Sequence, residues 1–137
     1  MERVAYFNGQ YLPESKVCVS FRDRGFILGD AVFDAERTFA GKIFRLEAHI
    51  DRLYQSLEKA RIDPGLSAAE MTEITRETVQ RNLALLGPAE DYWVMQRVTR
   101  GLAVVGGELW QSTGATVIVE CTPLPLRARA PLLRDGL

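Results

Sequence analysis

The stretch AVFDAERTFAGKIFRLEAHIDRLYQSL, residues 31–57, changes its periodicity part-way along and thereby decides the fold. Residues 31–39 alternate with a period of two, as a strand does. Ala40-Gly41 then turns the chain back into residues 42–46. From residue 47 the apolar side chains recur at the spacing of a helix, at Ile50, Leu53, Tyr54 and Leu57. We therefore predict a hairpin over residues 31–46, followed by a helix that ends near residue 61.

The segment before residue 31 opens with a second hairpin. Val4 to Phe7 lead into Asn8-Gly9, two residues that tolerate positive φ, and the chain leaves this turn through residues 10–12. We expect a short strand near residues 17–20 and then a loop over residues 22–29.

The segment after residue 61 predicts one more helix and two more strands. Ser67 and Glu70 have the spacing of a capping box, which starts a helix that stops near Gly87-Pro88. Residues 92–100 and 116–122 are predicted strands, separated by a Gly-rich loop. This order predicts an α+β domain, an antiparallel sheet with two helices packed on one face.

The tail contains three of the six prolines and has no usable periodicity. We predict that residues 1–122 form one small domain and that residues 123–137 are an interdomain linker without regular structure. Such a linker would lead to a C-terminal catalytic domain that this chain lacks.

The composition excludes several classes of protein. Seventeen Lys and Arg against eighteen Asp and Glu give a net charge of −1, so we expect no nucleic acid or anionic membrane as a partner. With two distant cysteines and one histidine, we expect no zinc site and no disulfide framework. No apolar run approaches the ~20 residues that span a bilayer, so we expect a soluble cytoplasmic protein.

Six short motifs occur in order along the chain: Asn8-Gly9, DRGF at 23–26, GDAVFD at 29–34, GKIFRL at 41–46, AHIDRL at 48–53 with Ser56, and VTRG at 98–101. Together they resemble the N-terminal domain of the class IV, or fold type IV, pyridoxal-phosphate aminotransferases. That family includes branched-chain and D-amino-acid aminotransferases, (R)-selective amine transaminases and aminodeoxychorismate lyase. The resemblance implies pyridoxal 5′-phosphate as cofactor, transfer of an amino group from an amino acid or amine to a keto acid, and a homodimer.

Arg52 matches the family arginine that binds the cofactor phosphate. Guanidinium suits that role because its planar fork makes paired hydrogen bonds to phosphate oxygens. On a helical wheel, however, Arg52 lies nearly opposite the apolar stripe and beside Lys59, where a solvated surface charge is usual. Both interpretations hold if this helix face borders a cleft that another domain closes.

His49 and Ser56 share the flank of the same helix. A sole histidine suggests an acid or base. We prefer an orienting role in the first helical turn, because the family's proton transfers are attributed to its Schiff-base lysine.

Phe33 and Arg37 lie on one face of the predicted strand. The resemblance implies that the Phe33 position contacts the substrate side chain, whereas the alternative is an ordinary core aromatic. Arg37 is a candidate anchor for a substrate carboxylate, because a charge on a face shared with aromatics is costly unless it is paired or faces a polar cavity.

Tyr92 and Trp93 are further candidates for the substrate pocket. The sequence departs here from two subfamilies. Val94 stands where branched-chain enzymes carry arginine, and Val105-Gly106-Gly107 stands where D-amino-acid enzymes carry an Arg-x-His trap. These departures favour an amine substrate, or a substrate held through Arg37.

The catalytic Schiff-base lysine is missing, because none of Lys16, Lys42 and Lys59 fits that role. We therefore expect the chain alone to be inactive. Two alternatives to an aminotransferase domain stay open: a domain of an aminodeoxychorismate-lyase-like enzyme, and a non-catalytic single domain that serves dimerisation or binding.

Overall fold

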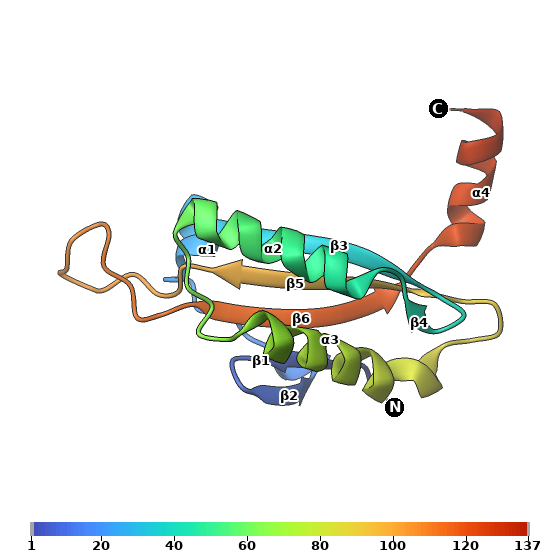
Figure 1. Ribbon diagram of the computed structural model, residues 1–137, viewed down its shortest axis with the longest axis horizontal. Helices are drawn as coiled ribbons and strands as arrows, with labels where there is room; N and C mark the ends of the chain where they lie inside the picture. The colour runs from blue at the N-terminus through green and yellow to red at the C-terminus, as the bar shows by residue number, and fades with distance from the viewer. Residues whose placement is uncertain (1, 137) are drawn as a thin grey trace.

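The computed structural model describes residues 2–136 and contains a six-stranded sheet in the order β2-β1-β6-β5-β3-β4 (Figure 1). Every neighbouring pair of strands is antiparallel. The strands are β1 Val4–Phe7, β2 Gln10–Pro13, β3 Ala31–Phe39, β4 Lys42–Ile43, β5 Tyr92–Thr99 and β6 Thr116–Pro123. The helices are α1 Arg24–Leu28, α2 Leu46–Ala60, α3 Ala68–Asn82 and α4 Leu126–Asp135, with short 3-10 turns at Glu14–Lys16 and Leu83–Leu85.

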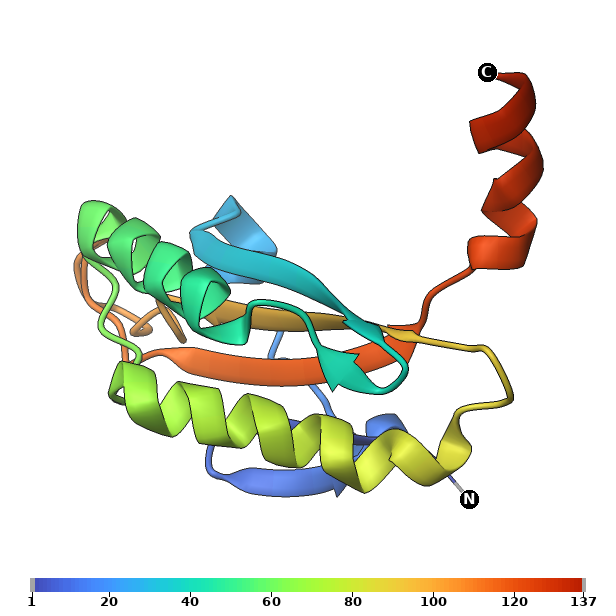
Figure 2. The same cartoon turned by 45° about the vertical axis from the view of Figure 1, so that its right-hand side comes forward.

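Helices α2 and α3 cover one face of this sheet, α2 over β3 and α3 over β6 and β1 (Figure 2). The apolar stripe predicted for α2 points into the core, where Leu53 is fully buried. Met71 of α3 and Val98 and Val119 of the sheet pack in the same cluster. The predicted α+β architecture, an antiparallel sheet with two helices on one face, is confirmed.

Strand β3 presents two different faces, as its alternation predicts. Asp34, Glu36 and Thr38 point toward the helices and are buried. Phe33 and its i+2 neighbours point to the opposite face of the sheet. We call the part of that face formed by Phe33, Arg37, Phe39 and Trp93 the open face.

Three local predictions are wrong. Residues 17–20 form no strand, and the predicted loop over residues 22–29 contains α1, in which the Gly25 amide donates to the N-cap side chain of Asp23 at 2.7 Å. Strand β4 is only two residues long because Leu46 already belongs to α2.

The predicted linker is also more regular than expected, because residues 126–135 form α4. Leu, Arg and Ala are good helix formers, and here they outweigh the interior Pro131. Helix α4 buries none of its residues and projects away from the sheet (Figure 2). The domain boundary at residue 122 remains a prediction. No helix within residues 2–136 is long and apolar enough to cross a membrane.

Candidate active site on strand β3 and helix α2

A buried carboxylate, Asp34, joins β3 to α2. It is 4% exposed and accepts hydrogen bonds from Arg52 Nε at 2.6 Å and Arg52 Nη2 at 2.7 Å. His49 Nδ1 lies 2.7 Å from the same carboxylate, on the same side of α2 as Arg52. Burial alone would raise the pKa of Asp34, but these hydrogen bonds outweigh it and hold the pKa below its usual range. Asp34 is therefore an ionised partner of both side chains, to which His49 donates.

The guanidinium of Arg52 reaches solvent although its partner is buried. Its side chain is 64% exposed, and Nη1 has no hydrogen-bond partner among residues 2–136. The solvent-facing position expected from the helical wheel is thus correct. One edge of the group is held by Asp34 while the Nη1 donors remain available to an anion.

Glu36 lies two residues further along β3 on the same covered face. Its Oε1 accepts a hydrogen bond from Gln96 Nε2 at 2.6 Å, whereas Oε2 of Glu36 and Oε1 of Gln96 are buried and unpartnered within residues 2–136. Burial raises the pKa of Glu36 to about 7, and the nearby charge of Asp34 adds to the effect. The Glu36 carboxyl therefore gains or loses its proton near neutral pH.

Asp34, Glu36 and His49 together place potential ligand atoms within 4.8 Å of one another. Both oxygens of Asp34 are already bonded to Arg52, so the geometry is that of an ion pair.

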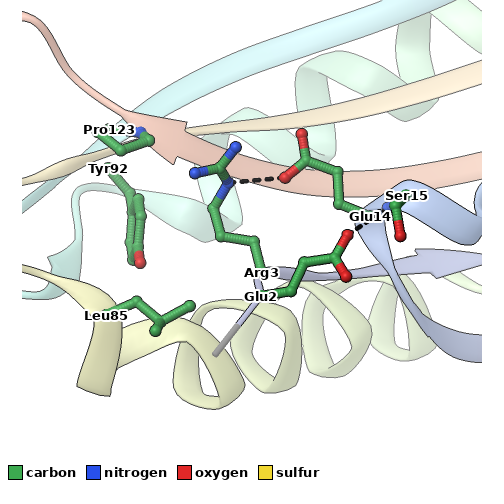
Figure 3. Close-up of a pocket in the computed structure, with 7 residues that line it drawn as sticks. All are labelled: Glu2, Arg3, Glu14, Ser15, Leu85, Tyr92 and Pro123. Atoms are coloured by element: carbon green, nitrogen blue, oxygen red, sulfur yellow. Dashed lines mark hydrogen bonds and ion pairs between the residues drawn. The ribbon is translucent and has the colours of Figure 1, made fainter.

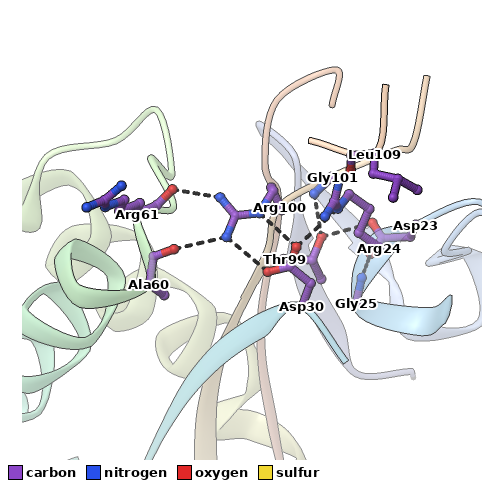
Figure 4. Close-up of polar contacts among 10 residues, drawn as sticks. All are labelled: Asp23, Arg24, Gly25, Asp30, Ala60, Arg61, Thr99, Arg100, Gly101 and Leu109. Atoms are coloured by element: carbon purple, nitrogen blue, oxygen red, sulfur yellow. Dashed lines mark hydrogen bonds and ion pairs between the residues drawn. The ribbon is translucent and has the colours of Figure 1, made fainter. Parts of the chain in front are cut away.

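A second ionic network fixes the other end of α2 (Figure 4). Arg100, directly after β5, donates to the carbonyls of Ala60 and Arg61 at 2.9 and 2.7 Å, where α2 ends. The same guanidinium binds Asp30, just before β3, through Nε at 2.7 Å and Nη2 at 3.1 Å. Asp30 also receives Arg24 Nε at 3.1 Å, and these hydrogen bonds lower its pKa. This network holds α2, which carries Arg52, against β3, which carries Asp34.

Asp23 completes the anchoring of this corner of the sheet. It is fully buried and accepts hydrogen bonds from the hydroxyls of Thr99 at 3.0 Å (Figure 4) and Thr116 at 2.6 Å. Gly101, the residue after Arg100, has a φ of +89°. A Cβ at this position would lie 1.5 Å from the carbonyl oxygen of Gly114. The DRG and TRG motifs are therefore structural in this chain.

The open face carries three of the four predicted substrate-binding residues. Phe33 is 66% exposed, so it is not a core aromatic in this structure. Arg37 donates to the Thr38 carbonyl at 3.1 Å, pairs with Asp91 at 3.3 Å and lies over the ring of Phe39. The charge of Arg37 is therefore paired with Asp91, directly before β5, and pairing is one of the two conditions under which a charge is tolerated there.

Trp93 lies directly across from Arg37 in the register of β3 and β5, and Arg129 of α4 approaches its ring. Tyr92 does not reach this face, because adjacent residues of a strand point to opposite sides. It is 1% exposed and its hydroxyl donates to the Asn82 carbonyl at 2.7 Å. The structure therefore separates the two aromatic candidates.

Tyr92 borders a different depression, beside the N-terminal hairpin (Figure 3). The charges there are already paired, Arg3 with Glu14 at 2.8 Å and Glu2 with the Ser15 amide at 2.6 Å. Among the predicted site residues, Tyr92 alone lines this depression. The depression is therefore not supported as the active site.

The remaining candidates have local roles. Ser56 donates to the Arg52 carbonyl at 2.9 Å within α2. The bond from His49 to Asp34 ties the first turns of α2 to β3, which favours the orienting interpretation. Lys16, Lys42 and Lys59 are all exposed, and none makes a hydrogen bond to the Asp34 cluster.

Residues 31–131 match the family model described as amino-transferase class IV. The chain belongs to the class IV aminotransferase family. The match covers both β3 and α2, and therefore Asp34, His49 and Arg52.

Curated relatives agree with this membership. The chain is 34% identical over 133 residues to a putative branched-chain-amino-acid aminotransferase of Methanocaldococcus jannaschii, covering 96% of this chain and 43% of that protein. It is 30% identical over 103 residues to D-alanine aminotransferase of Staphylococcus aureus, covering 75% of this chain and 34% of that protein. The chain thus spans about two fifths or less of the length of these class IV relatives.

Solved structures share the fold. A branched-chain amino acid aminotransferase of Escherichia coli has a TM-score of 0.78 at 21% identity, over 95% of this chain and 43% of that one. A hypothetical aminotransferase of Mycobacterium tuberculosis, in its PLP-bound form, has a TM-score of 0.76 at 23% identity, over 93% of this chain and 42% of that one. The fold is that of fold type IV aminotransferases.

Sequence reasoning missed four charged residues in and beside the candidate site, namely Asp34, Glu36, Asp30 and Arg100. One signal was available for Asp34. The alternation placed it on the face opposite Phe33, and His49 and Arg52 lie one helical turn apart. A buried carboxylate needs cationic partners, and these two lie on one flank of the helix that follows the strand.

Proposed function

We propose that this chain is the small domain of a pyridoxal-phosphate-dependent aminotransferase and that Arg52 binds the cofactor phosphate. The observation that carries the proposal is an exposed guanidinium held by a buried carboxylate, on the helix that bears the AHIDRL motif. The lysine and the remaining length of the enzyme would come from chain beyond these 137 residues.

The residues present fit the phosphate part of pyridoxal phosphate. A phosphate needs donors that are charged and accessible, and the Nη1 donors of Arg52 meet both conditions. When bound, the cofactor supplies the carbonyl chemistry that exchanges an amino group for a keto group. Within this chain, Arg52 would bind the cofactor phosphate, while Asp34 and Arg100 hold β3 and α2 together.

The open face is the part of the domain that we assign to the substrate. Phe33 supplies apolar surface next to the paired charge of Arg37, and Trp93 extends that surface. We propose an amino acid or amine as donor and a keto acid as acceptor. Tyr92 is not included, because it is buried on the other face.

A homodimer belongs to the same proposal, as does a cytoplasmic location. The open face leaves Phe33 and Phe39 exposed, and the loop between β5 and β6 exposes Leu109 and Trp110. Exposed apolar groups of this kind favour association with a partner.

Arg52→Ala tests the phosphate assignment directly on this chain. The probe is pyridoxine 5′-phosphate, which carries the phosphate but no aldehyde and so forms no Schiff base with surface lysines. Loss of a charge-assisted contact costs about 1.5 to 3 kcal/mol, which is a ten- to hundredfold weaker affinity by calorimetric titration. Arg52→Lys should recover only part, because an ammonium has no fork.

Two controls make the result specific. Lys59→Ala removes a positive charge two turns along α2 and should leave the affinity unchanged. Unphosphorylated pyridoxine should bind the wild type and Arg52→Ala equally weakly. Equal affinity of both proteins for the phosphorylated probe would refute the assignment, provided that circular dichroism shows both to be folded.

A further inference from the structure

Asp34 meets Arg52 along one specific edge of the guanidinium. Nε and Nη2 donate to the two carboxylate oxygens at 2.6 and 2.7 Å, so two parallel hydrogen bonds define the plane of the group. The donors of Nη1 lie outside this pair. The ion pair therefore fixes which part of Arg52 remains for a ligand.

The carboxylate itself is fixed from several directions. Asp34 lies in the middle of β3, paired with Gln96 of β5, and is 4% exposed. His49, one turn before Arg52 on α2, supplies the third hydrogen bond to this carboxylate, at 2.7 Å. Because Arg100 holds the far end of the same helix, neither Asp34 nor the backbone of Arg52 is free to shift.

Two opposite effects on anion binding follow from such a partner. The negative charge of Asp34 cancels part of the positive potential of Arg52, which weakens binding. The fixed geometry removes rotamer freedom that a free arginine, with about 2 kcal/mol of side-chain entropy, would lose on binding. An exposed arginine in water is screened, so we judge the second effect to be the larger.

We propose that Asp34 is a positioning residue that orients Arg52 for a phosphate dianion before the ligand arrives. The inference rests on the proposed function, since it names the device by which Arg52 performs its part. His49 supports the same carboxylate and is the second member of the device.

Asp34→Asn and Asp34→Glu test this proposal with pyridoxine 5′-phosphate as the probe. The first variant removes the charge and one acceptor but keeps the size. The second keeps the charge but moves the carboxylate by one methylene. We expect both variants to bind the probe about three- to tenfold more weakly than the wild type, because both lose the bidentate geometry.

Asp51→Asn is the matched control, because it removes an equal charge from the exposed residue next to Arg52 in α2. It should not weaken binding. If charge alone mattered, Asp34→Asn would bind more tightly than the wild type and Asp34→Glu would bind equally well. Either result, in a folded variant, would overturn the positioning role.

NMR supplies a readout that a purely structural role of Asp34 would not move. The Nε–H signal of Arg52 should be sharp and protected in the wild type and should shift on addition of the probe. In Asp34→Asn it should be broadened by exchange with water while the backbone amide spectrum stays native-like. An Arg52 Nε–H signal that is as sharp and protected in Asp34→Asn as in the wild type would contradict the proposal. The Arg52→Ala titration distinguishes failure of the phosphate site from failure of the positioning role. If Arg52→Ala binds the probe as tightly as the wild type, the phosphate site itself is refuted. If Arg52→Ala loses affinity but neither Asp34 variant does, only the positioning role is refuted.

Discussion

Glu36→Gln should change how the stability of the domain depends on pH. Glu36 is 4% exposed, and its surroundings supply one hydrogen bond, from Gln96, to Oε1. Burial raises its pKa to about 7 from an ordinary value of 4.5, with Asp34 adding to the rise and Arg52 opposing it. The folded protein therefore binds a proton at Glu36 that the unfolded chain releases at lower pH.

The sign follows from this difference. Between pH 4.5 and 7 the folded state holds more protons than the unfolded state, so its stability falls as the pH rises. The difference in pKa corresponds to roughly 3 kcal/mol at 1.36 kcal/mol per pH unit, fully lost above pH 7. Glutamine is the neutral analogue of the protonated acid, and its amide can donate to the unpartnered Gln96 Oε1.

Urea unfolding of the wild type and of Glu36→Gln, at intervals from pH 5 to pH 8, measures the effect. We expect similar unfolding free energies near pH 5 and a variant that is more stable by about 2 to 3 kcal/mol at pH 8. Other titrating groups are common to both proteins and cancel in the difference. Glu58→Gln, at an exposed position of α2, is the control and should follow the wild type. Parallel stability curves for the wild type and Glu36→Gln would refute the reasoning.

Two further predictions concern the backbone and the assembly. Gly101→Ala should unfold at lower urea concentration than Gly114→Ala. Both glycines have positive φ, which costs alanine about 1 to 2 kcal/mol, but only at Gly101 would the Cβ strike backbone, at 1.5 Å from the Gly114 carbonyl oxygen. Equal losses of stability in the two variants would show that the close approach of Gly101 to the Gly114 carbonyl is unimportant. Sedimentation of the wild type at about 50 μM should show self-association through its exposed apolar groups, whereas a single monomeric species at that concentration would argue against the homodimer.

Local chemistry made much of the fold predictable. Asn8-Gly9 both have positive φ, as a tight hairpin turn requires. Ser67 and Glu70 cap α3 reciprocally, with the Ser67 amide donating to Glu70 at 2.7 Å. These devices act over three or four residues, so they are visible in the sequence.

The missed elements depend on distant residues or carry too short a pattern. Helix α1 has five residues, too few to show a helical period, and its N-cap Asp23 is held by Thr99 and Thr116 from the far end of the chain. Helix α4 contains Pro131, which ordinarily argues against a helix.

In the candidate site, too, some features were predictable from the sequence and others were not. The resemblance pointed to Arg52, and the helical wheel placed it toward solvent. Neither indicated that Asp34 lies beneath it, because that contact depends on how α2 crosses β3. Likewise, alternation grouped Phe33 with Arg37 correctly but left open which face of the sheet the helices cover. That choice is decided by the polar partners of Asp34 and Glu36, since Phe33 and Phe39 alone would favour the opposite orientation.

The two-faced pattern of β3 also constrains how the gene for this domain can change. In a strand, every side chain changes sides when the register shifts by one residue. If the start of β3 keeps its register, deletion of the Val32 codon would move Asp34 and Glu36 to the open face and push Phe33 and Arg37 under the helices. A point substitution in β3 alters the contacts of one side chain, but such a length change would disrupt both the proposed phosphate site and the core. Among homologous sequences, β3 should therefore vary in residue type while keeping its length.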